Sequence, residues 1–360
     1  MEPSRREPSY MEPSDMEPSD MEPSSTESSS TESSRTGQVS AFFPIMPVRA
    51  DTIEKFAELV CGTRLARLWM GQSLTFDTYH LYAYLAGRGL RVPTGTAVSV
   101  MALRHPYEAA VQARSISLLT GQPMTVGFGM GSPEIVDSLR GSPYASPLGA
   151  TREYLSMVRA LVNGEFVESS GTYHSLKGAL PPLPSGHPPI SVAAGVLRPG
   201  MARVVGEVAD AAITWLTPMD YVRDVLVPAL REGAAERDRA APRVVSMVHF
   251  AVERDGQDPR DVVLAANREH LKTGHYTAML RRAGLKADPS DPEGGAAALV
   301  EAGVFLTGSA KEIAVRIGEY LSSGVDEVVL SPGGVLLSKG VREALTDLRE
   351  VVAELETLDG

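Results

Sequence analysis

The chain has 360 residues, of which 43% are hydrophobic, and a formal net charge of −11. This length suits one large barrel or two ordinary domains. The charge balance excludes a dominant basic face for nucleic acid, and no apolar stretch approaches the roughly 18 residues that span a bilayer. Cys61 is the only cysteine, which excludes an intramolecular disulfide and a cysteine-based metal cluster. We expect a cytoplasmic protein with no nucleic-acid or membrane partner.

The start of the chain repeats a Met-Glu-Pro-Ser unit and continues into Ser, Thr and Glu. Residues 1–36 hold nine acidic and three basic side chains, so they contribute −6 of the charge and the rest of the chain −5. With few apolar side chains, this segment cannot offset the entropy lost on ordering. We predict a disordered tail over residues 1–37, either a docking segment or drifted low-complexity sequence, and a single domain over residues 38–360.

After the tail, short β-branched apolar runs alternate with amphipathic stretches, a pattern typical of a parallel sheet with crossover helices. Eight such units favour a closed (β/α)8 TIM barrel, an α/β fold. A doubly wound sheet is disfavoured because no Gly-x-Gly-x-x-Gly opens the first crossover. The predicted strands are 39–46, 67–71, 92–101, 124–129, 190–194, 211–215, 244–252 and 327–331.

Helices are expected between these strands. Asp51 and Glu54 have the spacing of a capping box, and Pro106 suits a first helical turn. Long insertions are expected after strand four (residues 130–150) and before strand five (165–189), where they would frame the C-terminal mouth of a barrel. A third long stretch, 284–302, is rich in Gly, Ala and Pro and is expected to be mobile. The predicted helices are 51–60, 78–87, 106–119, 151–162, 199–208, 221–239, 310–322 and 341–358.

Two strand ends carry small residues. Gly127-Phe128-Gly129-Met130-Gly131-Ser132 exposes backbone amides, as a phosphate-binding turn requires, although glycines there also fit a plain tight turn. Ala193-Ala194-Gly195-Val196 lies at the end of strand five, ahead of a helix. Neighbouring strand ends of this kind provide room for one phosphate and a flat ring.

Further motifs follow one another in a specific order and spacing. The region of strand three contains Gly95-Thr96-Ala97-Val98 and Leu103-Arg104-His105-Pro106. The series continues with Arg152-Glu153-Tyr154-Leu155, Leu161-Val162-Asn163-Gly164-Glu165, Val192-Ala193-Ala194-Gly195, Ala209-Asp210 and Ile213-Thr214-Trp215. Together with the glycine-rich loop, these motifs resemble luciferase-like monooxygenases over residues 39–360, in style closest to coenzyme F420-dependent reductases.

The resemblance implies a luciferase-like barrel with the cofactor ring across its C-terminal mouth. It also implies a non-proline cis peptide at Ala97–Val98 that bends the ring. Trp215 would lie near the ring edge, with a core tryptophan as the alternative. The implied cofactor-binding residues are Gly71, Ala97, Val98, Gly129, Met130, Gly131, Ser132, Ala194, Gly195, Val196 and Trp215.

The sequence departs from the family just after strand two. Many members have an acidic residue or histidine and a further histidine there, where this chain has Trp69-Met70-Gly71-Gln72-Ser73. A base near neutral pH assists oxygen activation, whereas hydride transfer requires chiefly orientation of donor and acceptor. The departure therefore favours a reductase. Candidates for the proton donor, each with a structural role as the alternative, are Gln72, Ser73, Tyr79, His80, His105, Tyr144 and His174.

The other histidines, His187, His249, His270 and His275, show no metal-ligand spacing, and we expect no catalytic metal. The absence of a nucleophile elbow and of a Walker loop excludes acyl and phosphoryl transfer.

Three functions remain open. The first is a coenzyme F420-dependent oxidoreductase that transfers a hydride to an activated C=C, C=N or C=O bond. Its substrate would be a small molecule or a modified peptide, as in a natural-product tailoring dehydroamino acid reductase. The second is an FMN-dependent monooxygenase using O2, and the third a non-catalytic flavin-binding partner subunit. Arginines for the anionic coenzyme tail, or else for solvated helix faces, are Arg104, Arg140, Arg152 and Arg198.

The resemblance also suggests a homodimer through the helices that flank strands two and three. The predicted helix 78–87 carries Tyr79, Tyr82 and Tyr84, which would serve either that interface or core packing.

Overall fold

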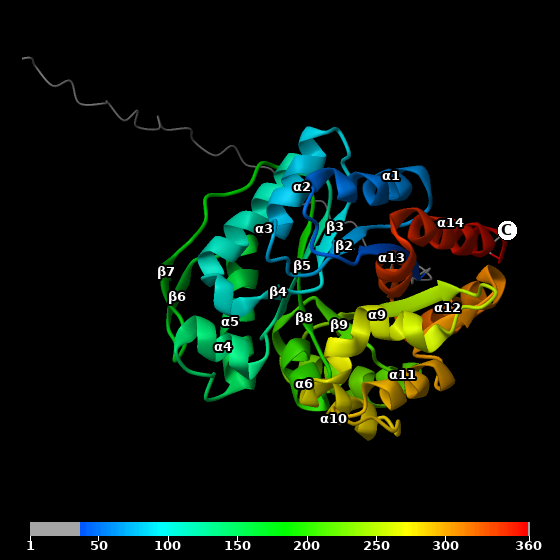
Figure 1. Cartoon of the computed structure of the whole chain (residues 1–360). Helices are drawn as coiled ribbons and strands as arrows, with labels where there is room; N and C mark the ends of the chain where they lie inside the picture. The colour runs from blue at the N-terminus through cyan, green and yellow to red at the C-terminus, as the bar shows by residue number, and fades with distance from the viewer. Residues whose placement is uncertain (1–36, 359–360) are drawn as a thin grey trace, which may run out of the picture. The chain divides into compact units, whose positions relative to one another are not determined.

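The computed structural model describes residues 37–358, and the predicted tail lies almost entirely outside this range. Eight parallel strands form a closed barrel, in which each strand pairs with the next and the last pairs with the first. The predicted (β/α)8 fold is confirmed (Figure 1). The barrel strands are β1 (Gln38–Phe43), β2 (Leu68–Met70), β3 (Thr94–Thr96), β5 (Met124–Gly129), β8 (Ile190–Gly195), β9 (Ala211–Trp215), β10 (Arg243–Val252) and β12 (Glu327–Ser331).

The predicted helices are present, with shifts at some of their ends. They are α1 (Glu54–Gly62) after a 3-10 turn (Ala50–Ile53), α2 (Thr78–Gly87), α3 (Pro106–Thr120), α5 (Pro147–Val162), α6 (Pro199–Val208), α7 (Met219–Tyr221) running through a π-helical turn (Val222–Leu226) into α8 (Val227–Ala235), α12 (Ala310–Ser322) and α14 (Val341–Leu358). The predicted capping box is wrong. Asp51 instead accepts hydrogen bonds from the Arg49 guanidinium, and Glu54 accepts from Tyr84 and Arg88.

The long connections contain structure of their own. The stretch 130–150 forms α4 (Pro133–Arg140), and the stretch 165–189 forms an antiparallel hairpin of β6 (Val167–Ser170) and β7 (Ser175–Gly178). The expectation that 284–302 is mobile is wrong, because it contains α11 (Pro292–Glu301) with Leu299 fully buried. Asp291 caps this helix by accepting from the Gly294 N–H at 2.9 Å.

The sequence patterns did not predict several shorter elements. After β10 the chain forms α9 (Pro259–Leu271) and α10 (Gly274–Arg282), and after α11 it forms β11 (Phe305–Gly308), which pairs with the C-terminal half of β10. The remaining ones are β4 (Ser99–Val100), the 3-10 turn Met101–Leu103 and α13 (Gly333–Lys339). Among residues 37–358, no helix is long and apolar enough to cross a membrane.

Alternate residues of each strand face the interior of the barrel. One apolar cluster fills this interior, with Val98 and Trp215 as partly exposed members packed against it. Its buried members are Phe42, Trp69, Ala97, Ala193, Ala211, Ile213, Val245, Met247 and Val329. Val98 and Trp215 lie at C-terminal strand ends, so they form the part of this interior that faces the mouth.

The tyrosines of α2 serve the packing of their own chain. Tyr79 and Tyr82 are buried, and the Tyr82 hydroxyl donates to the Gly95 carbonyl at 2.6 Å. The Tyr84 hydroxyl donates to Glu54. Of the two roles considered for these tyrosines, core packing is the one observed, and the homodimer stays a prediction.

Candidate active site at the barrel mouth

The chain after β3 turns sharply at the mouth of the barrel. The Ala97–Val98 peptide is cis, which confirms the prediction made for that bond. The end of β2 holds this turn on both sides, because Ala97 N–H donates to the Met70 carbonyl at 2.9 Å and Gln72 N–H donates to the Val98 carbonyl at 3.0 Å. The Gln72 side-chain oxygen also accepts from Val100 N–H at 3.3 Å. Gln72 therefore positions the backbone of this turn.

Glycines at neighbouring strand ends make room for the Val98 side chain. A Cβ on Gly129 would lie 2.5 Å from Val98 Cγ2, and one on Gly195 would lie 3.7 Å from Val98 Cγ1. A Cβ on Gly71 would lie 3.3 Å from the Ala97 carbonyl oxygen. The fold thus brings Gly71, Ala97, Val98, Gly129 and Gly195 together, and their binding of a cofactor stays a prediction. Val98 and Trp215 offer a small apolar surface of the kind that supports the face of a planar ring.

Two helix N-termini begin beside this surface. Ser132 caps α4 by accepting from Ile135 N–H at 3.3 Å, and Gly131 just before it has φ +79°. The N-terminus of α6 has no side-chain cap. Because β5 pairs with β8, both helices start at the same edge of the mouth. Free N–H groups and helix dipoles at such a place favour an anion.

The side chains of Ala194 and Val196 face away from this edge. Both are buried in the core between strands and helices, so only their backbones are available to a ligand. Met130 is partly buried against the same core.

Of the four arginines considered for an anionic tail, two are engaged within the chain. Arg104 is paired with Asp77 and stacks on Tyr79, and Arg152 makes a two-pronged pair with Glu207 at 2.7 Å for each hydrogen bond. Arg140 lies over the Tyr144 ring, 4.0 Å from its centroid. Arg198, at the start of α6, is half-buried beside the anion-favouring edge.

Of the candidate proton donors, His105 and His174 come together, with their ring centroids 6.0 Å apart, whereas His80 and Ser73 lie elsewhere. His80 points away from the core with 81% of its side chain exposed, and Ser73 is buried with its hydroxyl 3.2 Å from that of Thr75. The His105 ring caps α3 by accepting from Tyr107 N–H at 3.2 Å, which is the structural role considered for His105 as the alternative to proton donation. Tyr144 is buried against Tyr173.

The β6–β7 hairpin brings His174 to α5. Glu153 accepts from the N–H groups of Thr172 and Tyr173, each at 2.9 Å, and from that of His174. The His174 ring lies 5.4 Å from that of Tyr154, whose buried hydroxyl has no partner in the described part of the chain. Burial lowers the pKa of His174 and raises the pKa of Tyr154 well above its ordinary value.

On the other side of the mouth, polar side chains that the sequence patterns did not assign to the site lie around Trp215. We define the mouth cluster as Trp215, His249, Asn267, His270 and Ser331. The His249 ring lies 4.6 Å and the His270 ring 5.4 Å from the Trp215 ring, and His249 is the ladder partner of Ser331. Within residues 37–358, both nitrogens of His249, both polar atoms of Asn267, Trp215 Nε1, His270 Nδ1 and Ser331 Oγ are buried and lack a hydrogen-bond partner.

Both histidines of the cluster are neutral at physiological pH. Burial, together with neighbouring His270, lowers the pKa of His249 to about 3. Burial and neighbouring His275 lower the pKa of His270 to about 4, against a smaller opposing influence of Glu269. A neutral imidazole has one donor and one acceptor nitrogen, so the cluster can both donate and accept.

Most of the barrel matches a known protein family. Residues 47–327 match the family described as luciferase-like monooxygenase. The chain belongs to the luciferase-like monooxygenase family.

Enzymes whose names or structures give different cofactors are similar to this chain. An F420-dependent glucose-6-phosphate dehydrogenase of Nocardia farcinica is 30% identical over 265 residues, which cover 70% of this chain and 76% of that enzyme. The F420-dependent tetrahydromethanopterin reductase of Methanopyrus kandleri has a TM-score of 0.67 at 18% identity, covering 89% of this chain and 99% of that one. The oxygenating constituent of 3,6-diketocamphane monooxygenase of Pseudomonas putida, solved with FMN, has a TM-score of 0.63 at 16% identity, with the same coverage. This luciferase-like chain is therefore a flavin- or deazaflavin-dependent oxidoreductase.

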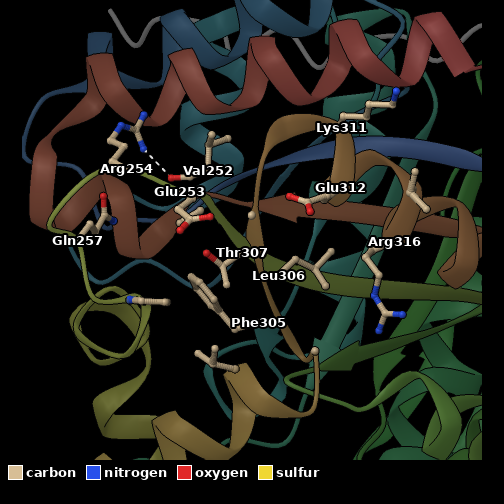
Figure 2. A pocket seen from close by; sticks show the side chains of 16 residues that line it. Val252, Glu253, Arg254, Gln257, Phe305, Leu306, Thr307, Lys311, Glu312 and Arg316 are labelled. Carbon is tan, nitrogen blue, oxygen red and sulfur yellow. Dashed lines mark hydrogen bonds between the residues drawn. The ribbon is translucent and has the colours of Figure 1, made fainter.

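A separate hollow of about 690 Å³ lies between the end of β10, β11 and α12 of the luciferase-like barrel (Figure 2). Arg254 there donates to the Val252 carbonyl at 3.1 Å and pairs with Asp347, and Glu312 accepts from Ser309 N–H at 2.8 Å. None of the residues of the mouth cluster lines this hollow. Because its charged groups are largely engaged, the mouth is the better candidate for chemistry in this family member.

Proposed function

We propose that the chain is a coenzyme F420-dependent oxidoreductase that transfers a hydride to an activated C=C, C=N or C=O bond. The observation that carries this proposal is the combination at the mouth of an apolar ring support, Val98 and Trp215, with an anion-favouring edge. The end of β2 supports it too, because Gln72 binds backbone there and offers no titratable group for oxygen chemistry.

The described residues fit such a cofactor. The Val98 side chain would support the ring, and the backbone of residues 130–132 and 195–196 would face the phosphate at the starts of α4 and α6. Arg198 would pair with the anionic tail. When bound, the deazaflavin supplies or accepts the hydride, and the protein orients the two reacting carbons and excludes water.

An FMN-dependent monooxygenase is the second candidate. The same apolar support and anion edge suit a flavin phosphate, and a similar fold is known with FMN. Oxygen consumption with reduced FMN would favour this candidate, whereas cofactor binding without any turnover would favour the non-catalytic subunit.

Fluorescence titration with oxidised F420 and with FMN tests the proposal. We expect tight binding of F420 and weak binding of FMN. R198Q should weaken F420 binding about tenfold, which corresponds to about 1.4 kcal/mol. The matched control R91Q replaces an exposed arginine that precedes β3, at the opposite end of the barrel, and should bind like wild type. Tight FMN binding with weak F420 binding would contradict the proposal.

We also propose an unsaturated substrate in a natural-product or modified-peptide context, such as a dehydroamino acid. Reduction of a dehydroalanine-containing peptide by reduced F420, followed by mass spectrometry for a gain of two hydrogens, tests this. Oxidation of glucose 6-phosphate is the comparison reaction and is run with oxidised F420, because a dehydrogenation needs a cofactor that accepts the hydride. Exclusive turnover of the sugar phosphate would refute the unsaturated substrate.

A further inference from the structure

The mouth cluster contains an unusual number of buried polar atoms without hydrogen-bond partners in the described part of the chain. Nearly all such groups in folded proteins have a hydrogen-bond partner. Here seven buried atoms from three strands and a helix, on Trp215, His249, Asn267, His270 and Ser331, lack one within the described residues. The Trp215 ring lies 4.6 Å from that of His249 and 5.4 Å from that of His270, Ser331 is the ladder partner of His249, and Asn267 is on the same helix as His270. Such a concentration at one place indicates that the partner is a bound molecule.

The chemistry of the cluster limits what that molecule can be. Trp215 Nε1 only donates, whereas a neutral histidine, a serine and an asparagine can each both donate and accept. No member of the cluster carries a charge. The charged groups near the cluster are Glu269, which influences His270, and Arg198 and Glu134, which influence the neighbouring His275. A complementary ligand group is therefore uncharged and has both donor and acceptor capacity.

We propose that the mouth cluster binds an uncharged hydroxyl or carbonyl group of the substrate, with His249 and Ser331 as direct hydrogen-bonding partners. This assignment rests on the proposed function, because Trp215 belongs both to the cluster and to the surface on which the cofactor ring would lie. A substrate oxygen held by the cluster would place its carbon skeleton beside that surface. The cluster thus selects neutral oxygenated substrates, while the anion-favouring edge at α4 and α6 serves the cofactor.

The test uses the full chain labelled with 15N in its histidine side chains, of which there are seven. The probes are 1,2-propanediol and hydroxyacetone, which are uncharged, and lactate, their anionic counterpart. We expect the uncharged probes to shift the His249 and His270 nitrogen resonances, with lactate binding at least about tenfold more weakly. Each titration is repeated with oxidised F420 present.

The outcomes separate the two proposals. Normal F420 binding without any shift by the uncharged probes would overturn the cluster assignment, because the seven atoms would then bind only water. Lactate binding as tightly as propanediol would also overturn it. If F420 fails to bind while propanediol still shifts His249, the proposed function fails and the cluster assignment stands.

Variants add a second, independent measurement through the His270 resonances. S331A removes a hydroxyl that has no hydrogen-bond partner within residues 37–358, so it should fold normally and weaken propanediol binding several-fold. H249L should abolish binding, whereas H249N restores a donor and an acceptor and should retain part of it. The control S246A removes a buried β10 hydroxyl that is already bonded to Thr214 at 3.0 Å, and its propanediol affinity should equal that of wild type. Unchanged affinity in both S331A and H249L would refute the assignment.

Discussion

Glu327 near the N-terminal end of the barrel and His249 at the C-terminal mouth are both buried polar side chains that face the interior. Glu327 accepts hydrogen bonds from Ser40 and Trp69 at 2.7 Å each and from Arg243 at 2.9 Å, and Arg67 lies 3.4 Å away. His249 has no hydrogen-bond partner among the described residues. A buried polar group without a partner costs about 1–3 kcal/mol. One end of the barrel therefore uses its polar groups for stability, and the other keeps them available for a ligand.

The largest effect is expected from removing the negative charge of Glu327. E327Q leaves the buried guanidinium of Arg67 without a counter-charge, and breaking one side of such a network costs about 3–5 kcal/mol. Urea denaturation should show a loss of this size. The control E168Q, in an exposed pair with Lys177, should lose less than about 1 kcal/mol. If both variants lose a similarly small amount of unfolding free energy, the predicted difference between the buried and the exposed ion pair is wrong.

The buried His249 at the mouth should make the stability of the chain depend on pH. The folded-state pKa of His249 is lowered from 6.5 to about 3. Below pH 6.5 the unfolded chain therefore binds more protons at this histidine than the folded chain does, and the stability decreases as the pH is lowered. Between pH 7 and pH 5 this histidine should account for a loss of about 2 kcal/mol. H249N should therefore lose about 2 kcal/mol less than wild type over this interval, as measured by urea denaturation at both pH values. H80N, which replaces an exposed ring, is the control, and equal pH dependence in H249N and wild type would contradict the prediction.

A pair of serines gives the finest comparison. S40A removes a hydrogen bond to a buried carboxylate and should cost about 1.5–3 kcal/mol. S331A removes a hydroxyl that has no partner in the described part of the chain, so its free energy of unfolding should change by less than about 1 kcal/mol, or rise. Thermal or urea unfolding of the two variants side by side measures the difference, and a larger loss in S331A would reverse the roles assigned to the two ends.

The barrel was predictable because its signals are local. Each strand is a short apolar run with its own boundaries, and Pro199 and Pro106 mark helix starts that the structure confirms. The failed capping box shows that side chains distant in sequence can override a local signal. Asp51 and Glu54 have capping-box spacing, but Arg49, Tyr84 and Arg88 compete for these carboxylates across the fold.

The site was predictable only in part. The family resemblance located Ala97–Val98 and the glycines around Val98, but pairing between distant charges, such as Arg104 with Asp77, is not visible in a sequence. His249 and His270 were considered only as metal ligands. The alternation of Val245, Met247 and His249 predicts that the His249 side chain faces the barrel interior, near the C-terminal end of its strand. That this side chain has no hydrogen-bond partner among the described residues is visible only in the folded structure.

The chain has two tryptophans, and the fold places them differently. Trp69 is fully buried and bonded to Glu327, whereas Trp215 lies at the mouth beside His249. An incoming molecule can quench the emission of Trp215 while leaving that of Trp69 unchanged, whereas denaturation alters both. The barrel thus contains a built-in pair of optical reporters, in which one indole reports occupancy and the other reports whether the scaffold is intact.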